Sequence, residues 1–167
     1  SDTARPNNVD STATVSTKAV SEALSIYRDL EFIGESGTLD GGDVLRVDRT
    51  LYVGKSGRSS AVGISNLRDI VGPHGYSVVG VPVTGCLHLK SAATLVSADT
   101  LLINPSWVDP DAFGDLRTVT VDPAEPYGAN TLLLEGGLLY STSYPATRRK
   151  LEELGLAENT LVIYTSD

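Results

Sequence analysis

The sequence of 167 residues contains no methionine and a single cysteine, Cys86. One cysteine excludes an internal disulfide framework and a zinc site made of several thiolates. It fits a reducing compartment, so we expect a cytoplasmic protein. Long apolar runs are missing too, because no stretch approaches the ~18 consecutive apolar residues of a membrane helix. The polar residues 1–15 do not resemble a signal peptide. We therefore expect a soluble protein without a membrane partner.

Histidine and basic residues are also scarce. His74 and His88 are the two histidines, and no carboxylate or thiol spacing around them is typical of a metal site, so neither a metal nor an organic cofactor is expected. With 13 Lys and Arg against 21 Asp and Glu, the formal charge is −8, and no basic run exceeds Arg148-Arg149-Lys150. This composition excludes a typical nucleic-acid-binding surface and favours a small cationic substrate as the partner.

The chain does contain enough apolar residues, 41%, for one globular domain with a sizeable core. These residues follow a repeat in which two strands, a helix and a third strand succeed one another as a ββαβ unit. The closing strands begin near Ser77, Thr118 and Thr160, which are 41 and 42 residues apart. A four-stranded all-β blade is the alternative of similar length, but the helix in each repeat argues against it. The sequence therefore predicts an α/β protein whose repeats stack around a pseudo-symmetry axis, with strands inside and helices outside.

The predicted repeats span approximately residues 38–83, 87–122 and 128–164. Their expected strands are 43–47, 50–54, 77–83, 89–96, 100–104, 118–122, 130–134, 138–142 and 160–164, and their expected helices are 61–71, 109–113 and 144–154.

Ahead of the first repeat, the pattern predicts a helix over 17–30, capped by Ser16, and a short strand over 31–33. These elements would be the end of a preceding repeat. Residues 1–15 are rich in Ser, Thr, Asn and Asp and show no periodicity, so we expect a loose segment there, followed by the folded domain over 16–167.

A polar side chain stands at the mouth of the first strand of each repeat: Asp40, His88 and Asn130. Equivalent positions of stacked repeats converge. An acid beside an imidazole can orient a general base, since histidine titrates nearest neutral pH and a carboxylate fixes its tautomer. Taken singly, an Asp before Gly-Gly is more often a turn residue, and a lone histidine on a strand is more often structural. Their common position in the repeat favours the functional interpretation.

Three segments in register resemble the consecutive signatures of the dimethylarginine dimethylaminohydrolases. They are Thr38–Leu45, Tyr52–Ser59 and Leu87–Ser91, and the later segments Tyr127–Asn130 and Tyr144–Arg148 fit as well. The resemblance covers roughly residues 5–167 and extends to the amidinotransferase-like, or pentein, superfamily. It implies a five-fold αβ propeller of the pentein type, of which about three ββαβ units are present here, so that 16–167 would be an incomplete propeller domain.

In this family a cysteine attacks the guanidinium carbon of a methylated arginine, and the products are citrulline and a methylamine. The resemblance implies that Asp40 orients His88, that His88 serves the leaving amine and then water as general acid and base, and that Arg58 binds the substrate α-carboxylate. The planar fork of an arginine bonds a carboxylate bidentately. Without the family, Arg58 would be a solvated residue at a helix start, where a cation opposes the helix dipole.

The family's nucleophilic cysteine belongs to the same position of the next repeat, near position 172 at a period of about 42 residues. We therefore expect this chain to be a C-terminal fragment that is inactive alone. Cys86 is two residues from His88, which on an extended segment would separate the pair by about 6.5 to 7 Å. A free cysteine is usually a small buried hydrophobe, so Cys86 is not expected to substitute. The family's guanidinium-binding carboxylates also precede this chain, and Arg58-Ser59-Ser60 stands where many relatives have Arg-Thr-Asn.

Two other functions stay open. Another guanidine-modifying enzyme, an arginine deiminase or amidinotransferase, shares the Gly-Gly-Asp and His segments, although deiminases usually carry Glu where Asp40 stands. A non-catalytic binding protein on the same propeller, which the ribosomal anti-association initiation factor resembles, would need neither the Asp40 and His88 pair nor Arg58. Methylated arginine is the expected small-molecule partner, and a homo-oligomer is left open because an incomplete propeller has open sheet edges.

Overall fold

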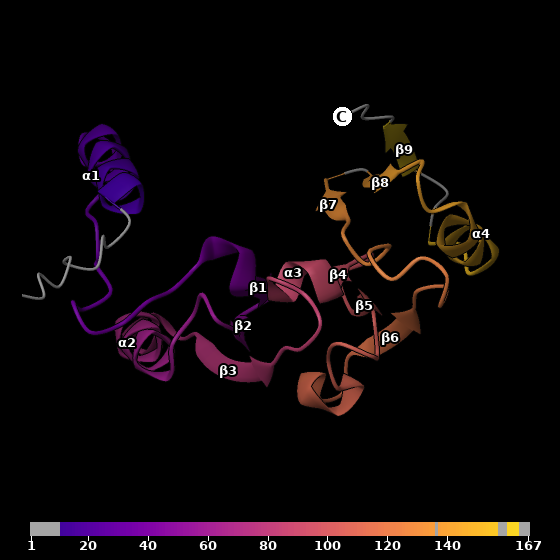
Figure 1. Cartoon of the computed structure of the whole chain (residues 1–167), viewed down its shortest axis with the longest axis horizontal. Coiled ribbons are helices and arrows are strands. Elements are labelled where there is room, and N and C mark those ends of the chain that lie inside the picture. Colours follow the sequence, from indigo (N-terminus) through magenta and orange to yellow (C-terminus); the bar gives the residue numbers. More distant parts are fainter. Residues whose placement is uncertain (1–10, 136, 157–159, 164–167) are drawn as a thin grey trace, which may run out of the picture. The chain divides into compact units, whose positions relative to one another are not determined.

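The computed structural model describes residues 11–135, 137–156 and 160–163 and divides the chain after Phe32 into two compact parts. In the first part, helix α1 (Ser11–Leu24) begins and ends six residues earlier than the predicted 17–30 (Figure 1). Ser and Thr recur throughout this region, and each is a good N-cap, so capping residues alone do not fix where the helix begins. Of the expected loose segment, residues 1–10 lie outside the described residues, and the helix covers the rest. The strand expected over 31–33 does not form, because no described strand pairs with it.

In the second part, the described residues form three three-stranded sheets, each made of strands consecutive in the chain. In each sheet the first two strands are antiparallel, and the third runs parallel to the second. The ββαβ repeat predicted from the sequence is thus confirmed. The strands are β1 (Val44–Val47), β2 (Thr50–Lys55) and β3 (Ser77–Pro82); β4 (Ala93–Leu95), β5 (Thr100–Ile103) and β6 (Arg117–Thr120); and β7 (Leu132–Leu134), β8 (Gly137–Ser141) and β9 (Thr160–Ile163).

A helical segment connects the parallel strands of each sheet, as a parallel connection requires a crossover. Figure 1 shows α2 beside the first sheet and α4 beside the third. The crossovers are α2 (Ala61–Val71), the 3₁₀ helix η3 (Pro110–Phe113) and α4 (Pro145–Glu153), and the remaining short helices are η1 (Gly41–Asp43), η2 (Gly72–His74) and α3 (Leu89–Ala92). Helix α2 coincides with its predicted range, because the Ser60 side chain caps it by accepting from the Gly63 N–H (3.1 Å) and Gly72-Pro73 follows it.

The predicted strand 89–96 is wrong over its first half. The chain there forms the single helical turn α3 before β4 begins at Ala93. Leu, Lys and Ala favour helix over strand, and the two fully buried residues of this turn, Leu89 and Ala92, are three positions apart, which places both on one helical face. The turn shortens the strand and places His88 at the N-terminal end of α3.

The largest apolar cluster joins the first and second sheets. It contains residues of both, including Tyr52, Val81, Leu101 and Ile103, together with Phe113 of η3. The rings of Tyr52 and Phe113 lie 5.2 Å apart, and the Tyr52 hydroxyl donates to the Phe113 carbonyl at 3.1 Å. Because Leu101 and Ile103 of the buried strand β5 belong to this cluster, the core fixes the second sheet against the first. It therefore fixes the segment between them, which carries His88.

Candidate active site

Asp40 is held by both its backbone and its side chain. It is the N-cap of η1 in an extended conformation, and its Oδ1 accepts from the Gly42 N–H at 2.8 Å. Its own N–H donates to the Ser59 Oγ at 3.0 Å. The Gly42 N–H, with smaller contributions from His88 and Arg58, lowers the pKa of the Asp40 carboxyl below its usual value, although partial burial opposes this effect. Asp40 is therefore an ionised, fixed carboxylate at neutral pH.

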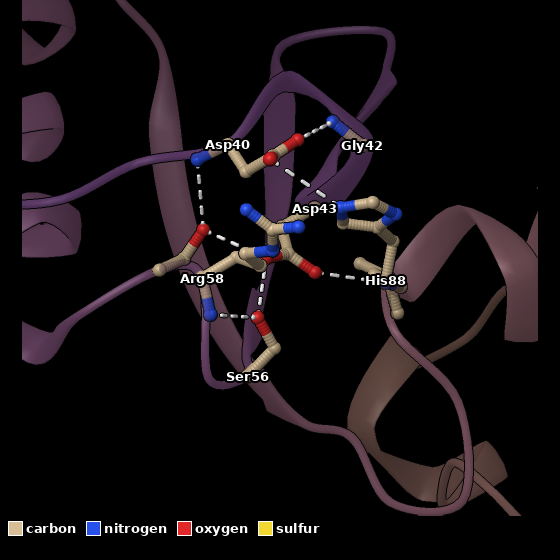
Figure 2. A network of polar contacts seen from close by, with 8 residues as sticks. Asp40, Gly42, Asp43, Ser56, Arg58 and His88 are labelled. Atoms are coloured by element: carbon tan, nitrogen blue, oxygen red, sulfur yellow. Dashed lines mark hydrogen bonds and ion pairs between the residues drawn. The ribbon is translucent and has the colours of Figure 1, made fainter. Parts of the chain in front are cut away.

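His88 faces this carboxylate from the segment that leads into α3. Its Nε2 lies 3.3 Å from Asp40 Oδ2, and the side chains of His88 and Asp40 remain 25% and 35% exposed, so the pair is reachable from solvent (Figure 2). The Nε2 atom itself is enclosed, and its approach to Asp40 is at ion-pair distance without the alignment of a hydrogen bond. The imidazole makes no hydrogen bond that caps α3, so helix capping is not the role of this side chain.

Gly42 is the residue that lets His88 come so close. A Cβ on Gly42 would lie 2.7 Å from the Cγ and 2.8 Å from the Cδ2 of the His88 ring, both closer than real Cβ contacts. At the neighbouring Gly41, a Cβ would meet nothing within 4 Å. The second glycine of the Gly-Gly pair is thus required by the close approach of the ring, while the first is not.

The loop before His88 is fixed against the second sheet's outgoing segment. The Thr84 N–H donates to the Trp107 carbonyl at 2.9 Å. Gly85 adopts a positive φ of 71°, and a Cβ there would lie 2.3 Å from the Trp107 ring. This packing positions the peptide that carries Cys86 and His88.

Arg58 lies in the loop that follows β2 and is exposed. Its N–H donates to the Ser56 Oγ at 2.9 Å, and its guanidinium is close enough to Asp40 to lower the pKa of that carboxyl. Figure 2 shows its side chain directed toward the Asp40 and His88 pair. The structure therefore brings together the three residues singled out in the sequence as site residues.

Asp43 is a member of this cluster that the sequence did not single out. Its side chain is completely buried, its Oδ1 accepts from the Leu89 N–H at 2.9 Å, and its Oδ2 accepts from Ser56 Oγ at 2.5 Å and Ser59 Oγ at 2.8 Å. The Gly-Gly-Asp motif contains it, and the sequence assigned it to the start of a strand. The signal available in the sequence was an acidic residue directly before an apolar strand. A carboxylate buried at such a position needs several hydrogen-bond donors, which marks it for attention.

Cys86 and Asn130 do not join the pair. The Cys86 thiol donates to the His88 carbonyl at 3.3 Å and packs against the core, and burial raises the pKa of this thiol. It therefore lacks the features of an activated thiolate. Asn130 lies exposed ahead of β7, and its backbone N–H donates to the Tyr127 carbonyl at 3.4 Å.

In the ranges given above, no group of three or more His, Cys, Asp and Glu side chains is arranged to hold a metal ion. Nor is any helix within those ranges both long and apolar enough to cross a membrane.

Known proteins resemble this chain in sequence. No family model matches it. It is 40% identical over 142 residues to the N(G),N(G)-dimethylarginine dimethylaminohydrolase of Streptomyces coelicolor, which covers 83% of this chain and 54% of that protein. The protein of the same name from Pseudomonas aeruginosa is 30% identical over 126 residues, or 75% of this chain and 50% of the relative. The chain spans about half the length of the curated relatives it matches. A third relative, named thiazole synthase, from Nitrosococcus oceani, is 30% identical over 134 residues.

Solved structures agree. A P. aeruginosa dimethylarginine dimethylaminohydrolase, a cysteine-to-serine variant complexed with citrulline, matches 89% of this chain and 58% of its own with a TM-score of 0.76 and 27% identity. The inosamine-phosphate amidinotransferase of Streptomyces griseus shares the fold with a TM-score of 0.67 and 22% identity, over 78% of this chain and 42% of that one. These likenesses define an α/β fold of the amidinotransferase-like, or pentein, class. Within that class, the chain belongs to the dimethylarginine dimethylaminohydrolase family.

Proposed function

We propose that this protein is a hydrolase that converts Nω,Nω-dimethylarginine and water to citrulline and dimethylamine. The observation that carries the proposal is the approach of His88 Nε2 to Asp40 Oδ2 at 3.3 Å, beside Arg58. Membership of the family and the relative's complex with citrulline support it. The proposed nucleophile is a cysteine outside this chain. Cys86 is not suited to that role, because its thiol is bonded to a carbonyl and burial raises its pKa.

In the proposed reaction, the thiolate adds to the guanidinium carbon and the bond from that carbon to the dimethylated nitrogen breaks. His88, protonated, gives its proton to the departing dimethylamine. It then takes a proton from the water that attacks the same carbon, and the carbon–sulfur bond breaks to release citrulline and the thiolate. Asp40, which is ionised at neutral pH, stabilises the imidazolium that this cycle requires and fixes the ring.

Arg58 is the proposed clamp for the substrate α-carboxylate. It lies in an exposed loop, so its guanidinium can meet a solvated amino acid, and its N–H is anchored on Ser56. A guanidinium fork bonds a carboxylate bidentately, which fixes the direction as well as the position of a substrate. The proposed partner is accordingly a small cationic amino acid, which suits a chain of formal charge −8.

The cytoplasm is the proposed location. Its support is the single cysteine, which leaves no disulfide framework to maintain.

The test is citrulline release by the full-length gene product from dimethylarginine, monomethylarginine, arginine and agmatine. His88→Ala should abolish release, because His88 is the residue proposed here to protonate the leaving amine. His74→Ala is the matched control, since His74 is exposed in η2 and its carbonyl, not its imidazole, accepts from Arg49. Release from arginine in preference to dimethylarginine would replace the proposal with a deiminase. A folded protein inert on all four substrates would favour a non-catalytic binding protein.

A further inference from the structure

Asp43 lies at the point where three segments of the site meet. Its carboxylate is completely buried and, among the described residues, forms no ion pair with a Lys, Arg or His. Burying an unpaired carboxylate is costly unless several donors surround it. The three donors present are the hydroxyls of Ser56 and Ser59 and the backbone N–H of Leu89. A group so costly to bury is expected to serve a purpose that an apolar residue could not.

Each donor is one step from a proposed functional residue. Ser56 Oγ accepts from the Arg58 N–H at 2.9 Å, and Ser59 Oγ accepts from the Asp40 N–H at 3.0 Å. The third donor, the Leu89 N–H, belongs to the residue that follows His88. The clamp, the acid and the histidine are therefore all connected to one carboxylate, as the dashed lines in Figure 2 show.

The direction of these hydrogen bonds depends on the charge of Asp43. A serine hydroxyl has one proton to donate, and a backbone N–H can only donate. Because an ionised carboxylate only accepts, both hydroxyl protons point to Asp43 and both hydroxyl oxygens are left to accept from the amides of Arg58 and Asp40. An asparagine here would present an NH₂ group either to the Leu89 N–H or to the two hydroxyls. In either orientation, the NH₂ group would face a donor and at least one of the three hydrogen bonds donated to Asp43 would be lost.

A second, independent feature is the space kept for this carboxylate. Gly54 lies within strand β2, where glycine is disfavoured. A Cβ on Gly54 would lie 2.6 Å from Asp43 Oδ1 and 3.0 Å from the Leu89 Cβ. The strand therefore carries a glycine where the Asp43 and Leu89 contact passes closest to its backbone.

We infer that Asp43 is a positioning residue that sets Arg58 at a fixed place relative to the Asp40 and His88 pair, an inference that rests on the proposed function. The two serines connect Asp43 to different residues, so their substitutions should change different kinetic parameters. Ser56 transmits the effect of Asp43 to the substrate clamp, so Ser56→Ala raises KM and leaves kcat nearly unchanged. Ser59 transmits it to the acid, so Ser59→Ala lowers kcat and leaves KM nearly unchanged. Asp43→Asn changes both parameters, and kcat/KM falls on the order of 10- to 100-fold, the size expected from a misplacement of about 1 Å.

The test combines kinetics with amide hydrogen exchange in the full-length gene product. In Ser56→Ala, exchange should become faster at the Arg58 amide alone. In Ser59→Ala, it should become faster at the Asp40 amide alone. In Asp43→Asn, it should become faster at the amides of Arg58, Asp40 and Leu89. Ser59→Thr retains the hydroxyl and should restore both kcat and the protection of the Asp40 amide. If Asp43→Asn fails to fold, the two serine variants and this rescue still decide the inference.

Glu125→Gln is the matched control, since Glu125 is another carboxylate that accepts two backbone N–H bonds but lies outside the site. It should alter neither kinetic parameter and none of these three amides. Equal changes of KM and kcat in the two serine variants, or unchanged exchange in all of them, would overturn the inference. If the wild-type protein acts on no guanidine substrate, the proposed function fails, and the exchange pattern alone then decides the role of Asp43.

Discussion

Asp43 and Glu125 are two carboxylates of the same chain that accept hydrogen bonds in similar ways but organise different structures. Glu125 accepts from the N–H groups of Ala146 (2.9 Å) and Thr147 (2.7 Å). Both belong to the first turn of α4, where N–H groups have no partner within the helix. Asp43 accepts from two hydroxyls and one N–H, none of them belonging to a helix of more than one turn. Glu125 thus completes a helix, whereas Asp43 connects the two repeats that carry the proposed site. The chemistry of a carboxylate acceptor does not reveal its role, but the elements attached to it do.

The largest effect on kcat should come from removing the negative charge of Asp40, the acid that Asp43 helps to position. Asp40→Asn keeps the shape of the side chain but no longer stabilises a protonated His88, so kcat should fall roughly 10²- to 10⁴-fold, the range of general acid–base catalysis. Steady-state citrulline release checks this, with Asp109→Asn as control, because Asp109 is an exposed cap of η3 away from the site. A kcat within threefold of the wild type would show that Asp40 is a turn residue.

Gly42→Ala should have the next largest effect. The added Cβ would lie 2.7 Å from the His88 ring, so the ring must move, and kcat should fall on the order of 10- to 100-fold. The matched change Gly41→Ala adds the same methyl group where nothing lies within 4 Å and should leave kcat unchanged. The contrast between the two variants is the measurement. Equal activities would mean that the close approach of Gly42 and His88 is not needed.

Glu125→Gln sharpens the comparison from the structural side. The amide has one oxygen where the carboxylate has two, so one N–H at the start of α4 loses its acceptor and the helix dipole loses its neutralising charge. The free energy of unfolding should drop by about 1 kcal/mol, the usual cost of a lost cap, with kcat and KM unchanged. Chemical denaturation measures the first quantity. A kinetic change without a stability change would put Glu125 in the site.

The smallest expected effect is a dependence on pH. Burial alone would raise the pKa of Glu125, but the N–H groups of Thr147 and Ala146 outweigh it, so the pKa is lowered from the ordinary value of 4.5. A carboxyl whose pKa is lower in the folded state stabilises the fold above its unfolded pKa, and this contribution is lost as pH falls through the folded pKa. The Tm difference between wild type and Glu125→Gln should therefore be full at pH 7 and shrink below about pH 4. A difference that grows toward low pH would contradict the assignment.

The sequence predicted best the features that local chemistry determines. Helix α2 has a serine cap, an apolar face and a Gly-Pro stop, and its bounds agree with the prediction. The convergence of Asp40 and His88 was also predictable, because both begin a repeat and the repeat implies stacking. Helix α1 was misplaced because its many Ser and Thr residues offer several equally good starts.

Asp43 and α3 could not be predicted in the same way. The burial of Asp43 depends on a contact with Leu89, which is 46 residues away, and nothing in the local pattern reports that contact. The same contact occupies the Leu89 N–H, a donor at the start of α3 that has no partner within the helix. A tertiary bond between repeats therefore explains why Asp43 was missed, whereas α3 also reflects the helix propensity of its Leu, Lys and Ala.

The connection of the sheets also bears on how the molecule folds. Each described sheet consists of strands that follow one another directly, so its pairings close shorter loops than the contact between Asp43 and Leu89 and can form earlier, because the entropy of closing a loop grows with its length. The contact between Asp43 and Leu89 forms later, because it requires the first and second sheets to dock. We therefore expect refolding chains to regain helix and strand signals before the Tyr52 and Phe113 rings meet and the polar cluster closes.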